Sequence, residues 1–248
     1  DDSPADRRRV AMTFTEVRAG RHLNLRDIEQ GVERMNRLPS SDARVRIEPG
    51  GSPGTSVVVI EDRPDRTWRV GAGLDNSGQK STGQTTCTAS LAADNPLGLN
   101  DVLTVSASGD AEALAGFSRP ASQGYSGFYS VPYGPWTVTA SASFSEYRAY
   151  LDGGGAQYLS SGKTSVWGLD VSRVLHRSED SATSAGLNLN VKDIDNYLEN
   201  ERLIAGSYDV SVLGVSMGHS RALFDGMLSL RAGYDFGLPV LGAKGDTT

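Results

Sequence analysis

The sequence has a single cysteine, few aromatic residues and no long apolar run. Because Cys87 is alone among 248 residues, the chain cannot form an internal disulfide or a cysteine metal cluster. No apolar run reaches the roughly 18 residues that a transmembrane helix requires, which excludes a helical membrane protein. His22, His176 and His219 are scattered without the spacing of hydrolase or metalloprotease motifs, and no glycine-rich loop opens a helix. We therefore predict no enzyme activity, no metal site and no cofactor.

Charge is unevenly distributed along the chain, which carries a net charge of −6. Residues 1–66 hold 12 basic and 12 acidic residues, whereas residues 67–248 hold the remaining 12 basic and 18 acidic ones. No basic patch with interleaved aromatic residues is present, so we predict no nucleic-acid partner. With 38% hydrophobic residues and 29 glycines, the composition suits a single-layer sheet closed on itself better than a thick two-layer core.

Two helices are predicted near the start of the chain. The first spans Asp6–Val17. The second, Asn24–Leu38, is the clearest helix of the sequence, because Asn24 is a good N-cap and Asp27 stands at the capping-box position. Its predicted buried face follows the i, i+3, i+4 spacing of an amphipathic helix and consists of Leu25, Ile28, Val32, Met35 and Leu38.

Two short strands complete an α+β module. Ala43–Glu48 alternates as a strand, Pro49–Thr55 (PGGSPGT) is a hairpin loop, and Ser56–Glu61 is the returning strand. The predicted domain organisation is therefore a module over residues 1–61, a linker over residues 62–67, and an all-β region over residues 68–248.

The all-β region opens with WRVGAGLDN, in which apolar and small or charged residues alternate from Trp68 onward. Successive side chains of a strand point to opposite faces, so one face of this strand is apolar. The pattern recurs to give nine predicted strands, with Cys87 on an apolar face and a phase slip in the eighth strand near Gly214. Any single strand fits a soluble β-sandwich, but the whole set favours a transmembrane β-barrel.

The predicted connections alternate in length, as in barrels with short periplasmic turns and long outer loops. The short connections are Pro132–Pro135 and the segments near residues 176–181 and 219–221. The longer connections are near residues 109–122, 151–160 and 195–204. Aromatic residues at the two membrane interfaces would then be Trp68 and Trp136 at the periplasmic rim and Tyr147 and Tyr150 at the opposite rim.

Several motifs resemble the two-partner secretion translocators, the haemolysin and filamentous-haemagglutinin exporters. LNLRDIEQGVERMNRLPS and the PGGSPGTSVVVI hairpin resemble the second polypeptide-transport-associated (POTRA) repeat of that family. The barrel opening of the family is similar to WRVGAGLDNSGQKSTG, DNPLGLND, YSVPYGPW, FSEYR, YLSSGKTS and SRVLHR. These motifs occur in order over nearly the whole chain.

The resemblance implies a mainly β fold. A partial POTRA domain, the second repeat, is followed by the first nine or so strands of a 16-stranded antiparallel transmembrane barrel. The family's first repeat, plug helix and later strands have no counterpart here, and the second repeat lacks its opening strand. Because nine strands with open edges cannot span a membrane alone, we expect the chain to be a fragment.

The function implied by the resemblance is type V secretion of a haemolysin or adhesin. The protein would reside in the outer membrane with its POTRA part in the periplasm, capture an unfolded exoprotein there, and export it without a nucleotide or other cofactor. Further expected partners are outer-membrane lipid and the barrel-assembly machinery that inserts the protein. Two alternatives stay open, namely an insertase that assembles other barrels and a soluble β-rich adhesin module.

Two groups of candidate site residues follow. Ala43–Glu48 is either an inner strand or an edge strand that accepts an extended client by strand addition, as the family resemblance also implies. The predicted client-binding residues are Asn24, Arg26, Asp27, Gln30, Arg44, Val45, Arg46 and Ile47. Charges predicted to face the barrel lumen either hydrate a passing chain or pair with one another and stiffen the wall. They are Arg69, Asp75, Asp170, Arg173, Lys192, Asp225, Arg231 and Asp235.

Overall fold

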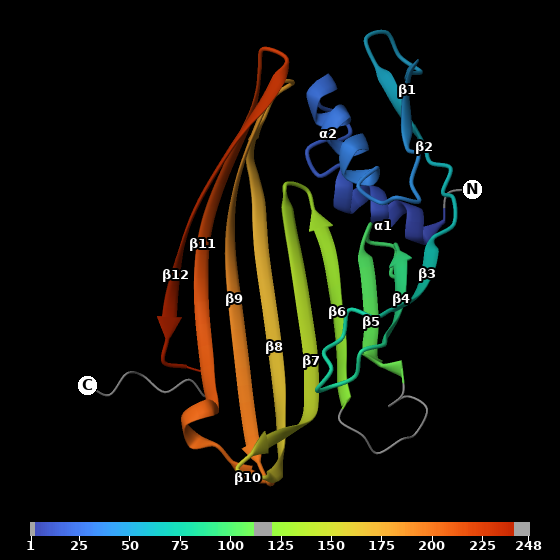
Figure 1. The fold of residues 1–248 in the computed structure, drawn as a ribbon. Coiled ribbons are helices and arrows are strands. Elements are labelled where there is room, and N and C mark those ends of the chain that lie inside the picture. The colour runs from blue at the N-terminus through green and yellow to red at the C-terminus, as the bar shows by residue number, and fades with distance from the viewer. Residues whose placement is uncertain (1–2, 112–120, 241–248) are drawn as a thin grey trace. The chain divides into compact units, whose positions relative to one another are not determined.

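The structure is a computed structural model that describes residues 3–111 and 121–240. It contains two α-helices, a two-stranded sheet and a large antiparallel sheet (Figure 1). Neither described helix is long and apolar enough to cross a membrane. Most of the predicted connection at residues 109–122 lies outside the described residues.

The helices begin at capping residues. Helix α1 (Pro4–Thr13) is shorter at its C-terminal end than predicted, and its N-cap Ser3 forms a capping box with Asp6. Helix α2 (Leu25–Met35) starts as predicted, because the Asn24 side chain accepts a hydrogen bond from the Arg26 amide at 3.1 Å. The predicted capping box of α2 is incomplete, since Asp27 accepts a hydrogen bond from the Asn24 side chain rather than from its backbone.

The helices pack on a hairpin of β1 (Arg44–Pro49) and β2 (Ser56–Glu61), which pair antiparallel. The buried core consists of Phe14, Ile28, Met35 and Ala43. Gly31 is required on α2, because a Cβ atom there would collide with the Phe14 ring. Leu25 was predicted to be buried but is 59% exposed, because the first turn of α2 extends past the core.

The large sheet is a meander in which neighbouring strands in the sequence are neighbours in space. Nine strands follow one another in the order β12-β11-β9-β8-β7-β6-β5-β4-β3, which agrees with the nine predicted strands, and the two-residue β10 pairs with β9. Their bounds are β3 (Trp68–Asp75), β4 (Thr86–Asp94), β5 (Val102–Asp110), β6 (Ala121–Tyr133), β7 (Trp136–Gly153), β8 (Ala156–Arg177), β9 (Ser181–Leu198), β10 (Glu201–Arg202), β11 (Tyr208–Leu223) and β12 (Gly226–Leu238). A 3-10 turn, Ile204–Gly206, precedes β11.

Two predicted connections are wrong in detail. The β11–β12 turn lies at Phe224–Asp225 rather than near residues 219–221. The predicted loop at residues 151–160 is instead a hairpin of extended strands, because Gly154 and Gly155 both adopt positive φ angles, as a two-residue hairpin turn requires.

The phase slip predicted near Gly214 is absent. The register of β11 runs without a shift from Tyr208 to Leu223 against β9 and β12. The pattern was misread because Val210 and Val212 lie on the polar side of the sheet, opposite Lys192 and Asn190. A register shift occurs instead in β8, between Val174 and His176.

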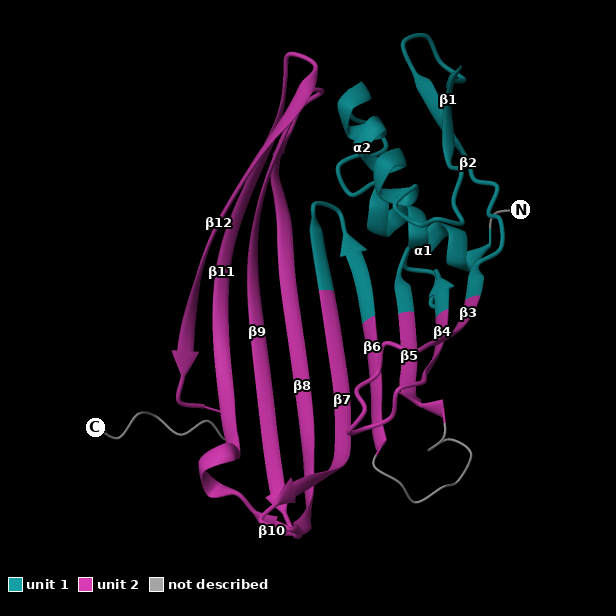
Figure 2. Cartoon of the chain, in the orientation of Figure 1, with its two compact units in different colours: residues 1–69, 92–103, 129–138 teal, residues 70–91, 104–128, 139–248 magenta. Residues whose placement is uncertain are grey.

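The described chain divides into two compact units (Figure 2). Unit 1 comprises residues 1–69, 92–103 and 129–138, and thus combines the helices and the β1–β2 hairpin with the β4–β5 and β6–β7 turns. Unit 2 comprises residues 70–91, 104–128 and 139–248, which form most of the large sheet. The two units are defined by contacts within the folded chain, whereas the predicted domains are continuous segments of the sequence. The predicted domain boundaries therefore stay a prediction.

Candidate functional site

Strand β1 has one partner among the described residues. It pairs with β2 from Arg44↔Glu61 to Pro49↔Ser56, and no other described strand pairs with it. The arginines of β1 are exposed and bind acidic neighbours: Arg44 with Asp42 at 2.9 Å, and Arg46 with Glu61 at 2.5 Å. Among the described residues, the side of β1 that faces away from β2 is therefore unpaired, and exposed charged side chains lie along the strand.

The predicted client-binding residues divide between this strand and α2. Val45 packs against the buried core and is not available to a ligand through its side chain. Ile47 is 47% exposed, and Val57, the partner of Glu48, is 50% exposed. Together with the exposed Leu25 of α2, these residues give unit 1 exposed apolar side chains beside charged ones.

On α2, the predicted polar residues are engaged near the N-terminus of the helix. Asn24 and Asp27 bond to one another at 3.1 Å, and Arg26 is exposed. The Gln30 side chain accepts a hydrogen bond from Arg34 at 3.2 Å, and Arg34 also pairs with Glu16 at 2.6 Å. Burial alone would raise the pKa of Glu16, but the hydrogen bond and positive charge of Arg34 lower this pKa below its ordinary value.

The strand register of unit 2 defines a polar face of the sheet. Asp170 pairs with Asn188, Asn188 with Gly214, and Gly214 with Asp235, so these four positions form a row across β8, β9, β11 and β12. A Cβ atom on Gly214 would collide with the side chains of Asn188 and Asp235, which shows that both side chains lie across the glycine on one face.

Other predicted lumen residues extend this polar face, with one exception. Lys192 and Arg231 have the same alternation as Asn188 and Asp235, and therefore share the face. Arg173 pairs with Ala185 and lies on the opposite face, two positions from Val171. Its placement in the lumen was a misreading, because the polar residue interrupts an otherwise apolar alternation.

The remaining three predicted lumen residues lie at or near the ends of strands. Arg69 and Asp75 share one face of β3 by alternation. Arg69 forms two 2.8 Å hydrogen bonds with the buried carboxylate of Asp94, Asp75 accepts a hydrogen bond from the Ser77 amide at 2.8 Å, and Asp225 occupies the β11–β12 turn.

The two tyrosines predicted at the outer rim lie on opposite faces of the sheet. Tyr147 donates a hydrogen bond to the Asn196 side chain at 3.1 Å and lies against Gly162, which places its ring on the polar face. Tyr150 is 50% exposed and, three positions along β7, points to the other face.

A buried polar cluster inside unit 1 was missed by sequence analysis. Arg9 is 6% exposed and donates hydrogen bonds to Asn100 at 2.8 Å, to Ser41 at 2.8 Å and to the carboxylate of Asp62. The fully buried Asn100 in turn donates a hydrogen bond to the Arg34 carbonyl at 2.6 Å. The motif DNPLGLND carries this turn, and its asparagines 95 and 100 adopt positive φ angles, but no local pattern identifies Arg9 as their partner.

Three further contacts fix the β4–β5 and β6–β7 turns within unit 1. The Ser40 amide donates a hydrogen bond to Asp94 at 3.1 Å. Arg37 donates one to Ser130 at 2.9 Å, and burial lowers the pKa of Arg37 while the charge of Asp101 opposes that shift. The Gly134 amide bonds to the Met12 carbonyl at 2.8 Å. These polar contacts join both turns to the helical part of unit 1.

A groove of about 880 Å³ lies within unit 1 beside this cluster. Its lining includes Arg9, Leu38, Asp62, Trp68, Asp94 and Pro96. The mixed lining of charged and apolar groups can receive an extended peptide segment but shows no metal site. Among the described residues, no group of three or more His, Cys, Asp or Glu side chains could hold a metal ion.

The chain matches the protein family described as haemolysin secretion/activation protein ShlB/FhaC/HecB over residues 54–248, and the POTRA domain over residues 1–49. It is 39% identical to the outer membrane transporter CdiB-2 of Burkholderia pseudomallei (strain 1026b) over 221 residues, which is 88% of this chain and 38% of the relative. It is 34% identical to the hemolysin transporter protein ShlB of Serratia marcescens over 224 residues, covering 90% and 40% of the two chains.

Solved structures agree with this match. CdiB from Escherichia coli superimposes with a TM-score of 0.89 at 34% identity, covering all of this chain and 45% of that one. CdiB from Acinetobacter baumannii shares the fold, with a TM-score of 0.78 at 22% identity over 95% of this chain and 44% of that one. The chain thus spans about two fifths of the length of the curated relatives that it matches.

Proposed function

The chain belongs to the family of haemolysin secretion/activation proteins ShlB/FhaC/HecB, and from this premise we propose that it serves two-partner secretion. It forms part of an outer-membrane translocator that captures an unfolded secreted exoprotein and exports it through a barrel. The observation that carries this proposal is the combination of a POTRA module with a meander sheet that has one apolar and one polar face. The sheet crosses the outer membrane, and the module lies in the periplasm.

Capture uses the free edge of β1. An extended client adds a strand beside Arg44–Pro49 through backbone hydrogen bonds, which depend little on client sequence. The exposed apolar side chains of Ile47 and Leu25, with Arg26 and Arg46 nearby in the same module, add a preference for clients that mix apolar and acidic residues. The proposed set also includes Asn24, Asp27, Gln30 and Arg44.

Passage uses the polar face. Asp170, Asp235, Lys192 and Arg231 carry both signs of charge, and Asn188 and Asn190 add neutral hydrogen-bonding groups. Such a wall hydrates a passing chain without holding a chain of either charge. The export is driven by folding of the client outside the cell and uses no nucleotide, metal or other cofactor and no enzymatic activity of the protein.

Further partners follow from the location. The apolar face of the sheet requires outer-membrane lipid, and insertion of the strands requires the barrel-assembly machinery of the cell. The exported client is a large exoprotein of the haemolysin or adhesin type, since transporters of haemolysin are among the relatives.

The test is client export from cells whose translocator carries single prolines at positions 44–48. Proline removes a backbone donor from the strand, so we expect secretion to fall at those positions whose amide faces away from β2. Outer-membrane levels and heat-modifiable gel mobility serve as controls for barrel assembly. Undiminished secretion by every proline variant with normal barrel levels would overturn the capture site.

A further inference from the structure

The apolar face of the large sheet has charged residues at both ends, and those at one end are basic. Around its middle, Trp167 and Leu169 of β8 pair with Val191 and Leu189 of β9, and Leu189 pairs with Leu213 of β11. The Phe144 ring of β7 contacts Trp167 edge-on, with ring centroids 5.3 Å apart. This apolar band covers several neighbouring strands of unit 2.

The end of this face at the β8–β9 and β11–β12 turns is basic. Register places Arg173 beside Ala185 and Met217, His176 beside Thr183 and His219, and Arg221 beside Ser181. These four cationic or imidazole side chains, which we term the basic rim (Arg173, His176, His219 and Arg221), therefore lie on the apolar face within three successive rows. Thr183 and His219 are joined by a 2.8 Å hydrogen bond between Oγ1 and Nδ1, which fixes the imidazole ring on this face.

Acidic residues near this end are confined to the turns. Glu179 and Asp180 occupy the β8–β9 turn, and Asp225 occupies the β11–β12 turn. All three follow the last paired residues of their strands, whereas the basic rim lies within the paired region. The basic rim is thus positioned between the apolar band and the acidic turns.

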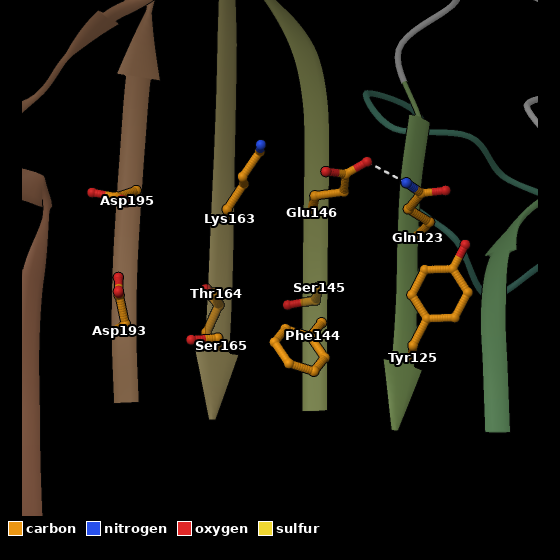
Figure 3. A pocket seen from close by; sticks show the side chains of 10 residues that line it. All are labelled: Gln123, Tyr125, Phe144, Ser145, Glu146, Lys163, Thr164, Ser165, Asp193 and Asp195. Carbon is orange, nitrogen blue, oxygen red and sulfur yellow. Dashed lines mark hydrogen bonds between the residues drawn. The ribbon is translucent and has the colours of Figure 1, made fainter. Parts of the chain in front are cut away.

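The opposite end of the same face carries both acidic and basic residues. Asp193 pairs with both Ser165 and Asp209, and Asp195 pairs with Lys163. A pocket of about 300 Å³ (Figure 3) is lined at this end by Glu146, Lys163, Ser165, Asp193 and Asp195. This end is of mixed charge, because Lys163 lies beside Asp195 and Arg202 forms an ion pair with Asp195. The basic rim therefore has no counterpart of a single charge sign among the residues named here.

We propose that the basic rim binds the phosphate groups of anionic phospholipids in the periplasmic leaflet of the outer membrane. This inference rests on the proposed membrane location. The chain enters the large sheet at the start of β3, directly after the module, and in an antiparallel meander the β8–β9 and β11–β12 turns lie at the same strand ends as that start. Acyl chains cover the apolar band, and Arg173 and Arg221 approach the lipid phosphate as charge-assisted donors.

The basic rim also fixes the depth of the sheet in the bilayer. Arginine side chains beside an apolar band extend their alkyl part along the band and direct the guanidinium toward the headgroups. His219, held by Thr183, supplies a fixed polar group between the two arginines. An anionic headgroup there opposes sliding of strands β8–β12 along the membrane normal.

The experiment titrates phosphatidylglycerol into the detergent-purified gene product that carries this chain, with the temperature of heat-modifiable gel mobility as readout. Phosphatidylcholine is the neutral reference lipid. We expect phosphatidylglycerol to raise this temperature for the wild type, with a half-maximal concentration roughly 25-fold higher for R173Q/R221Q, since each of the two arginines near a lipid surface contributes about fivefold in affinity.

Two variants make the result specific. R18Q/R21Q removes two exposed arginines from the soluble module and is expected to respond like the wild type, whereas R173K/R221K keeps the rim charge and is expected to respond to phosphatidylglycerol as well. An unchanged response of R173Q/R221Q, or an equal response to phosphatidylcholine, would overturn the lipid site while leaving secretion intact. A wild-type protein without heat-modifiable mobility would overturn both this site and the proposed translocator.

Discussion

At the scale of single residues, the buried Arg9 is the strongest predicted determinant of unit 1 stability. Its guanidinium donates hydrogen bonds to Asp62, Asn100 and Ser41. Removing one partner of a buried ion pair strands the other charge and costs about 3 kcal/mol or more. We expect Arg9→Ala to lose hydrogen-exchange protection in peptides from residues 4–61 and 92–103 of the full-length protein.

The matched control for Arg9 is Arg44, which forms an exposed ion pair with Asp42. Exposed pairs contribute about 0–1 kcal/mol, so Arg44→Ala should leave protection nearly unchanged. Equal protection in both variants would show that the buried cluster does not hold unit 1 together.

Glu16 predicts a pH dependence of the same unit. Because its pKa is lowered in the folded protein, its pairing with Arg34 stabilises the fold above the ordinary Glu value of 4.5 and ceases to do so as the pH falls through the lowered pKa. Glu16→Gln should therefore cost about 0.5–1 kcal/mol near neutral pH and less at about pH 3.

The measurement compares rate-corrected hydrogen exchange of wild type and Glu16→Gln at both pH values. A difference that grows as the pH falls would have the wrong sign and would contradict the assignment of a lowered pKa to Glu16.

At the scale of elements, the residue type at position 31 of α2 is restricted by Phe14, the C-cap residue of α1. Alanine is the better helix former by about 1 kcal/mol, yet a Cβ atom at this position would collide with Phe14. We expect Gly31→Ala to destabilise the module by about 1–3 kcal/mol through overpacking.

Hydrogen exchange of α2 peptides measures this effect. Gly51→Ala in the hairpin loop, where an added Cβ meets no atom within 4 Å, is the control and should be close to neutral. A stabilised Gly31→Ala variant would mean that the Phe14 ring yields to the new methyl group.

Elements with a clear local period were predictable, and contacts between distant segments were not. Strand β2 and the start of α2 at Asn24 follow from alternation and capping, which act over a few residues. Val210 and Val212 misled the reading of β11, because apolar residues on a polar face give the same period as a flipped strand. The bond between Arg9 and Asn100 spans 91 positions, so only the folded chain identifies it.

Among the candidate site residues, those that keep the polar alternation of their strand lie on the predicted face. Asp170, Asp235 and Arg231 share the polar face because a two-residue period fixes the side of each. Arg173 lies on the other face because it is an even number of positions from Val171 along β8. Its charge alone therefore does not predict the face on which it lies. The free edge of β1 depends on which strands lie beside it, which the sequence of β1 does not encode.

At the scale of the whole molecule, three surfaces have different roles in the proposed export of the client. The edge of β1 receives the client, the polar face of the sheet lines its path, and the apolar face with its basic rim meets lipid. Each surface comes from a different set of backbone positions, so substitutions on one can be made without altering the others. The separation makes the proposed secretion function testable surface by surface.

The most direct test is photo-crosslinking to a client arrested during export. A photoreactive residue is placed at Arg46 on β1, at Arg231 on the polar face or at Leu187 on the apolar face. The account predicts client adducts from positions 46 and 231 and none from position 187. Client adducts from position 187, or none from position 231 while the client is arrested in the translocator, would contradict passage along the polar face.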